Sequence, residues 1–357
     1  MIRQLCMRPY PQSGQRIAAA LATMHHLGPG LALAGAIAVS AYALEVLEGR
    51  LLTHQVLEAL VLALLLGALV RNTVRLPSGV LPGTAFASKM LLEAAVVVLG
   101  ASLDIRRLIE PGGRLLLAIL LGVGVGIVTS FGLSKLLGLA SRLAYLVAVG
   151  NAICGNSAIA AVAPVIRAER HEIASAIGLT AAVGMGIVLL LPAAVPVFGL
   201  SDFQYGILAG MAVYAVPQVM AAAYAVSPLS GDVALLVKLV RVMCLGPVVL
   251  ATSVVMRWRG HTATPLSWTQ VLPWFVVGFF ALLTCRSLGL MPTAVLLALR
   301  TVGRSLTLWA MAGVGLGVEL AAVRAVGLRV GLASALSMGL LAGVSLLLIV
   351  GFGLHVG

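Results

Sequence analysis

Long apolar stretches, separated by short polar segments that often contain arginine, run along almost the whole chain. Most of them approach the roughly 20 residues that an α-helix needs to cross a bilayer. The pattern predicts an all-α membrane protein with about 11 transmembrane helices. We expect these helices at residues 28–44, 55–70, 86–103, 115–137, 143–166, 172–198, 204–226, 233–256, 271–288, 293–319 and 326–353.

Composition places the chain in the same class, because 61% of its 357 residues are apolar and only 10% are charged. Soluble domains carry roughly 25% charged residues. The net charge of +12 would suggest nucleic-acid binding in a soluble protein, but the basic residues here lie mostly at predicted helix ends. We therefore interpret the charge as membrane orientation and contact with lipid headgroups, and we expect no nucleic-acid partner.

The sequence has no pattern typical of an enzyme or a metalloprotein. A P-loop, a dinucleotide-binding fingerprint, a nucleophile elbow and a zinc-protease motif are all absent from it. The four cysteines are scattered without metal-ligand spacing: Cys6, Cys154, Cys244 and Cys285. We therefore expect neither catalysis nor a cofactor nor a bound metal.

Loop charges predict how the chain is oriented. With the N-terminus in the cytoplasm, the inside loops hold most of the arginines, whereas acidic and basic residues nearly cancel in the outside loops. A cleavable signal is not evident. We expect residues 1–27 to be a cytoplasmic segment and residues 28–353 to form one multi-pass domain in the inner (plasma) membrane.

The stretch GNAICGNSAIAAVAPVI at residues 150–166 interrupts an apolar span with small polar residues. Cys154, Gly155, Asn156 and Ser157 occupy the break. Glycine frees the backbone, while asparagine and serine favour the start of a helix. A break halfway across a bilayer costs free energy unless it lines a site, as in transporters whose half-helices meet near the midplane. The alternative is a seam of small residues against a neighbouring helix.

A second triplet, Gly303-Arg304-Ser305, is similar to this Gly-Asn-Ser break and lies within the tenth predicted helix. If both are breaks, the chain contains two inverted five-helix repeats, at about residues 55–198 and 204–353. Arg304 would then be a buried cation of the site; the alternative is that it lies at a membrane interface. A competing register pairs the third and tenth helices through similar Leu-Gly, Leu and Arg positions at residues 99–107 and 316–324.

Lys238 and Arg241 are three residues apart and therefore share one face of an apolar helix. Two cations within lipid need acidic partners, water or an anionic ligand. Glu93 is the clearest carboxylate within a predicted span, and we take it as a candidate counter-ion and coupling residue. An internal ion-pair cluster is the alternative to an anion site. Because cations outnumber carboxylates within the spans, the balance favours a tetrahedral oxyanion such as sulfate.

The seventh predicted helix contains Tyr214, Pro217 and Gln218. Proline removes a helix hydrogen bond and predicts a kink. Glutamine both donates and accepts hydrogen bonds, so Gln218 is a candidate to orient a ligand. A proline kink without any binding role is the alternative.

Four segments are similar to one known family: CGNSAIAAVAPVI, EIASAIGLTAAVGMGIVLLLPAAV, the run from Gln218 through LVKLVRVMCLGPVVL, and AGVGLGVELAAVRAVG. They resemble the YeiH family of UPF0324-type membrane proteins, whose members are described as sulfate exporters. The resemblance covers most of the chain from about residue 28. It implies a fold similar to the bile-acid and sodium–proton antiporter class, with two crossed discontinuous helices, and assigns Cys154–Ser157 to the first of them.

One departure from that family concerns proton coupling. Many members have His-Glu before a Val-Ala-Gln-Val run, whereas this chain has Tyr214 and Ala215 before Val-Pro-Gln-Val. The resemblance therefore leaves Tyr214 at the place where a titratable residue of the family would act, and makes it a second coupling candidate beside Glu93.

The leading hypothesis from the sequence is a secondary active transporter that moves a small anion by alternating access. The Cys154–Ser157 and Gly303–Ser305 breaks would bind the anion together with Gln218, Lys238 and Arg241. A cation/proton antiporter, coupled to H⁺ or Na⁺ on the same fold, is one alternative. A membrane protein that serves a partner protein without transport is another, and the sequence leaves a homodimer open.

Overall fold

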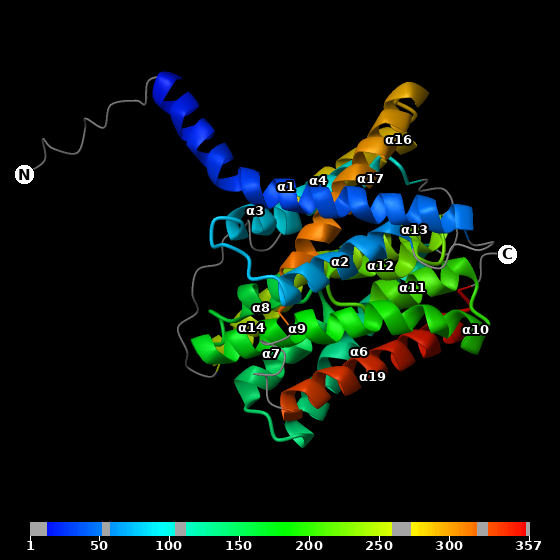
Figure 1. The fold of residues 1–357 in the computed structure, drawn as a ribbon. Helices are drawn as coiled ribbons and strands as arrows, with labels where there is room; N and C mark the ends of the chain where they lie inside the picture. The colour runs from blue at the N-terminus through cyan, green and yellow to red at the C-terminus, as the bar shows by residue number, and fades with distance from the viewer. Residues whose placement is uncertain (1–12, 52–57, 104–111, 259–272, 320–327, 355–357) are drawn as a thin grey trace, which may run out of the picture.

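Figure 1 shows the computed structural model of the chain, which describes residues 13–51, 58–103, 112–258, 273–319 and 328–354. Within these ranges the chain forms helices and connecting turns, without a β-strand. Six helices are long and apolar enough to cross a membrane. The all-α membrane class is therefore confirmed, whereas the number of crossings stays a prediction.

The first helix group lies uppermost in Figure 1 and packs the N-terminal helices against two helices from the last third of the chain. Its members are α1 (Ser13–Leu51), α2 (Ala59–Thr73), α3 (Leu81–Phe86), the π-turn η1 (Ala87–Leu91), α4 (Leu92–Gly100), α16 (Trp274–Ser287) and α17 (Thr293–Leu316). Gly67 of α2 and Gly315 of α17 let these two helices touch, since a methyl group at Gly315 would collide with the carbonyl oxygen of Leu64. Membrane helices commonly pack closely through such small residues.

The second helix group lies below the first in Figure 1. Its members are α6 (Gly112–Leu136), α7 (Ser141–Ala152), α8 (Asn156–Val162), α9 (Arg170–Leu190), η2 (Leu191–Ala193), α10 (Ala194–Phe198), α11 (Asp202–Ala212), α12 (Val216–Tyr224), α13 (Pro228–Met243), α14 (Leu245–Trp258) and α19 (Leu328–Gly351). α6 and α19 pack on each other and support α7 and α11. This group contains the break that the sequence predicts at Cys154–Ser157.

The segment expected to cross the membrane at residues 143–166 turns back halfway instead. α7 ends at Ala152, and α8 begins at Asn156 and packs against α7. Nη1 of Arg142, in the first turn of α7, lies 3.8 Å from Oε1 of Glu169, which precedes α9. A crossing would separate these side chains by roughly 30 Å. α7 and α8 therefore form a re-entrant hairpin, and the predicted crossing is wrong.

Residues 204–226 form a second re-entrant hairpin. Oη of Tyr205, near the start of α11, donates a hydrogen bond to the carbonyl oxygen of Ala222, near the end of α12, over 2.9 Å. The predicted crossing is therefore wrong here too. α9 and α10 carry the chain across the second group to the end where α11 starts, so the two hairpins enter from opposite ends (Figure 1).

The second expected break, at Gly303-Arg304-Ser305, is also wrong, because α17 continues through all three residues. Gly303 is buried against α4, where a methyl group would meet the side chains of Leu99 and Val98. Oγ1 of Thr307 donates to the carbonyl oxygen of Gly303 over 2.7 Å. A single glycine costs a helix only about 1 kcal/mol, which the surrounding apolar run and this packing outweigh.

Candidate functional site

The tips of the two hairpins meet on one lysine of α13. Nζ of Lys238 donates to the carbonyl oxygen of Ile153 over 2.6 Å and to that of Val213 over 2.9 Å. Ile153 directly follows α7, and Val213 directly follows α11. The lysine side chain is fully buried. One ammonium group therefore holds the turning points of both hairpins.

Arg241, one turn further along α13, donates hydrogen bonds to carbonyl groups at the same two helix ends. Its Nε and Nη2 donate to the carbonyl oxygen of Ala152 over 2.9 and 2.6 Å, and Nη2 also reaches that of Asn151 over 2.9 Å. Nη1 donates to the carbonyl oxygen of Gly210 on α11 over 2.6 Å. The guanidinium is buried, with 2% of the residue exposed.

These contacts have a simple electrostatic cause. The last carbonyl groups of a helix lack partners within it and carry a partial negative charge of about −0.5 per helix end. Lys238 and Arg241 satisfy such carbonyls at the ends of α7 and α11. Within the described part of the chain, both cations donate hydrogen bonds to backbone carbonyls rather than to carboxylates. Two helix ends therefore offset only about half of a charge of +2.

The first tip has a backbone conformation that requires glycine. Gly155 lies at φ 69° and ψ −121°, a combination that side chains with a Cβ rarely adopt. This turn brings the thiol of Cys154 to the amide of Ala158 and the hydroxyl of Ser157, both of which donate to it. Asn156 and Ser157 are exposed although the residues before them are buried. The tip thus presents two polar side chains at its surface.

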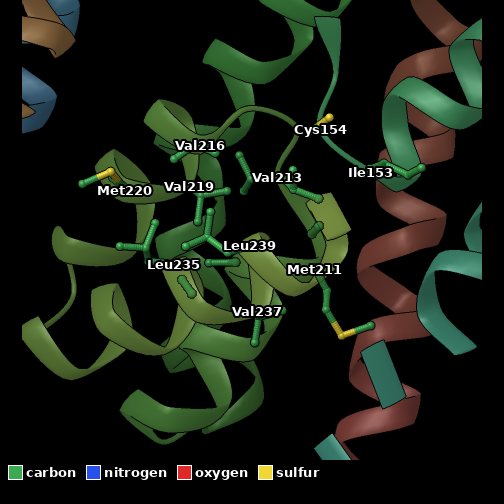
Figure 2. Packing of buried hydrophobic residues seen from close by; sticks show 14 of the residues in the cluster. Ile153, Cys154, Met211, Val213, Val216, Val219, Met220, Leu235, Val237 and Leu239 are labelled. Carbon is green, nitrogen blue, oxygen red and sulfur yellow. The ribbon is translucent and has the colours of Figure 1, made fainter. Parts of the chain in front are cut away.

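The second tip lies beside the first, as the neighbouring positions of Ile153, Cys154 and Val213 in Figure 2 show. Tyr214 is fully buried, and its hydroxyl lies near the Ser334 hydroxyl of α19. Pro217 stands in the first turn of α12, where its missing N–H is not needed. The expected kink is therefore a full break in the helix.

Gln218 is buried against α9 at a glycine. A methyl group at Gly184 would collide with the Gln218 amide group, so the missing Cβ makes room for this side chain. Oε1 of Gln218 has no partner within the described part of the chain. A buried amide oxygen without a partner is costly, and this one lies in the first turn of a helix that starts at the hairpin tip.

Three candidates from the tenth predicted helix lie away from the tips. Gly303 packs against α4, Ser305 is exposed, and Arg304 has 64% of its side chain exposed and lies 3.4 Å from Oε2 of Glu45. The structure therefore does not bring them together with Asn156 and Ser157.

Glu93 is not a counter-ion for the two buried cations. Its Oε2 accepts a hydrogen bond from Nε1 of Trp274 over 2.6 Å, within the first helix group. Cys6 lies outside the described residues, and Cys154, Cys244 and Cys285 are free thiols.

The sequence prediction missed the second hairpin tip at Val213–Ala215. The available signal was Pro217, because a proline favours the first turn of a new helix as well as a kink. It also did not single out two acidic residues near the ends of predicted spans, the buried Glu45 and the partly buried Glu58.

Long apolar helices, two re-entrant hairpins and buried cations at their meeting point define a polytopic α-helical membrane protein. The particular family follows from comparison with known proteins. The chain belongs to the UPF0324 family of membrane proteins: the family model described as Conserved hypothetical protein 698 matches residues 29–334.

Relatives in several bacteria agree with this assignment. A UPF0324 membrane protein of Brucella melitensis is 48% identical over 284 residues, which make up 80% of this chain and 79% of that protein. One from Bartonella henselae is 44% identical over 292 residues, 82% of this chain and 83% of that protein. A more distant one from Bacillus cereus is 33% identical over 240 residues, 66% and 70% of the two chains. No solved structure matches the chain, so a fold like the antiporter class stays a prediction.

Proposed function

We propose that the protein is a secondary active transporter of a small anion, such as sulfate, sulfite or an organosulfur anion, and that it works by alternating access. The observation that carries the proposal is the pair of buried cations, Lys238 and Arg241, at the meeting point of two re-entrant hairpins. Their charge of +2 faces carbonyl dipoles that offset about half of it. A small anion is the ligand that such a site attracts.

Polar groups for the anion come from both tips. Asn156 and Ser157 supply an amide and a hydroxyl that are exposed at the first tip. At the second tip the N-terminal end of α12 carries a partial positive charge, and the amide oxygen of Gln218 accepts no hydrogen bond from the described residues. In this proposal Lys238 and Arg241 act on the anion through their charge, while their hydrogen bonds hold the tips in place.

The proposal includes an inverted repeat of the helices. α9 follows the first hairpin and α13 with α14 follows the second, and the hairpins enter from opposite ends. α4 packs on α16, α17 packs on α2, and α6 packs on α19. A two-fold relation between α4 and α17 would produce these pairs, as in the register between residues 99–107 and 316–324, of which residues 104–107 and 320–324 lie outside the described residues. Inverted repeats around a central site are typical of alternating-access transporters.

The two helix groups provide a route for alternating access. Among the described helices, the main contacts between the groups are those of α12 with α2 and α17. A narrow contact allows one group to shift against the other as a body. The shift would carry both hairpin tips, because α13 joins them.

The hairpins also support the predicted orientation. Because α7 and α8 return to the side at which they start, Arg167 and Arg170 lie on the same side as Arg142. That side gains basic residues compared with the sequence prediction, which agrees with a cytoplasmic location and an N-terminus inside the cell. The inner membrane of the cell is the location that we propose.

A flux assay tests the proposal. Purified protein in liposomes should take up radiolabelled sulfate, sulfite or taurine, and Asn156→Ala with Ser157→Ala should reduce uptake of the accepted anion at least tenfold. Ser305→Ala, at an exposed position of α17 away from the tips, is the matched control and should keep at least half of the uptake. Unchanged uptake in the Asn156 and Ser157 variants, at normal protein abundance, would refute the site.

A cation/proton antiporter is the second candidate, and it is favoured by the buried carboxylate of Glu45 and by the buried Oε2 atom of the partly exposed Glu58. In the same liposomes, a pH-gradient dye that responds to Na⁺, K⁺ or Li⁺ but to no anion would support it. A non-transporting partner protein would give neither signal.

A further inference from the structure

Glu58 lies where the two helix groups meet. It directly precedes α2, and its carbonyl oxygen accepts the amide N–H groups of Val61 and Leu62 over 3.0 and 3.1 Å. α2 is one of the helices on which α12 of the second hairpin packs. Oε2 of Glu58 is buried and has no hydrogen-bond partner among the described residues. An ionised carboxylate is costly in this position unless a cation or a proton neutralises it.

The nearest carboxylate already has its partners. Oε1 of Glu45, on α1, accepts the amide N–H of Ala59 over 3.0 Å, and its Oε2 lies 3.4 Å from Nη2 of Arg304 on α17. The carboxylate of Glu45 acts electrostatically on Glu58, whose Oε2 has no such donor among the described residues. Of the two carboxyl groups, Glu58 is the one that the surroundings favour in its protonated form.

The second helix group contributes the remaining neighbours. Tyr224, the last residue of α12, interacts electrostatically with Glu58 and donates a hydrogen bond from Oη to Oδ1 of Asp232 on α13 over 2.8 Å. Arg300 and Arg286 exert their charge on Asp232. The side chain of the second helix group that interacts with Glu58 is therefore a tyrosine, and its hydroxyl already donates a hydrogen bond to Asp232.

Burial of its Oε2 and the nearby carboxylate of Glu45, which accepts the amide N–H of Ala59, both disfavour the ionised form of Glu58. Both helix groups take part, because α1 supplies the like charge and Tyr224 of the second hairpin interacts electrostatically with Glu58.

We propose that Glu58 binds a proton at the contact between the two helix groups and, on the basis of the proposed transport function, that H⁺ is the coupling ion. Displacement of α12 exposes the carboxyl group to water, and its O–H bond then dissociates to carboxylate and a hydrated proton. Return of α12 to the ionised group is favoured only after a proton binds again. Proton binding and the position of the second helix group are thereby linked.

Thermal unfolding of the full-length protein in detergent, without any anionic substrate, tests the proton site by itself. Since the folded state favours the protonated carboxyl group, stability falls as pH rises through the range in which this group loses its proton. Glu58→Gln should remove this part of the decline in melting temperature. Glu48→Gln, one turn from Glu45 on α1, is the matched control and should retain it. An unchanged decline in Glu58→Gln would overturn the proposal.

Two further measurements secure the conclusion. If Glu58→Gln does not fold, Glu45→Gln should shift the decline to lower pH, because the like charge is gone; no shift would count against the proposal. At constant pH 7.5, replacing K⁺ by Na⁺ should leave the melting temperature unchanged, and a stabilisation that needs Glu58 would mean a sodium site instead.

Liposomes then test the coupling. Anion flux should carry protons in the wild type and lose its dependence on a pH gradient in Glu58→Gln. If neither protein moves any anion while the pH-dependent stability behaves as expected, the transport function fails and the proton site stands. Anion flux that ignores the pH gradient in the wild type would overturn proton coupling.

Discussion

Replacing Gly155 by alanine tests the conformation of the first hairpin tip. At φ 69° and ψ −121°, a residue with a Cβ is strained by about 1–3 kcal/mol. The new methyl group would lie 3.7 Å from Cβ of Tyr214, which is an ordinary van der Waals contact and adds no collision. The expected loss in the free energy of unfolding is therefore the backbone strain alone, about 1–3 kcal/mol. This corresponds to a roughly 5- to 150-fold shift away from the observed tip.

Denaturant titration of the purified variant in detergent measures this loss directly. Gly186→Ala on α9 is the matched control, because a methyl group there meets no other atom within 4 Å and alanine favours a helix by up to about 1 kcal/mol over glycine. The control should be as stable as the wild type or slightly more stable. If Gly155→Ala unfolds within about 0.5 kcal/mol of the wild type, the argument that this turn needs glycine is refuted.

Two further substitutions test the packing. Lys238→Met leaves the carbonyl groups of Ile153 and Val213 without their shared donor and should lower the free energy of unfolding by about 2–4 kcal/mol. The loss is not larger, because the variant no longer has to bury an ammonium group. Equal or higher stability in a chemical denaturation experiment would contradict this. Gly315→Ala forces a methyl group against the carbonyl oxygen of Leu64 and should cost about 1–3 kcal/mol, measured by the same titration, and a neutral result would show that α2 and α17 separate easily.

The class of the protein and the position of the first break could be predicted from the sequence. Helix length and apolar composition decide whether a segment suits a bilayer, and Gly155 with two helix-start residues after it marks an interruption. Whether the chain then crosses or turns back could not be predicted. Both outcomes need the same number of apolar residues, and the distinction depends on the distance between Arg142 and Glu169, which local pattern does not encode.

The sequence predicts the second break at the wrong place, because the prediction follows the similarity of Gly303-Arg304-Ser305 to the first break and not the helix preference of the surrounding residues. Gly303 lies in a run of good helix formers and packs on α4, so the helix absorbs it. Pro217, in contrast, has no backbone N–H, so in a helix interior it would remove a hydrogen bond. Lys238 and Arg241 could be identified as special from their burial in an apolar run. Their partners are backbone carbonyls far away in sequence, which no pattern of side chains indicates.

The attachment of both hairpins to Lys238 and Arg241 has a consequence for communication between the two faces of the membrane. Moving either tip alone would leave a buried carbonyl group, or one of the two cations, without its partner. The chain therefore penalises any state in which one face has rearranged and the other has not. Such a penalty is a source of positive cooperativity, and it is reciprocal. A molecule that holds one hairpin open from one side of the membrane should weaken the closure of the other hairpin on the opposite side to the same degree.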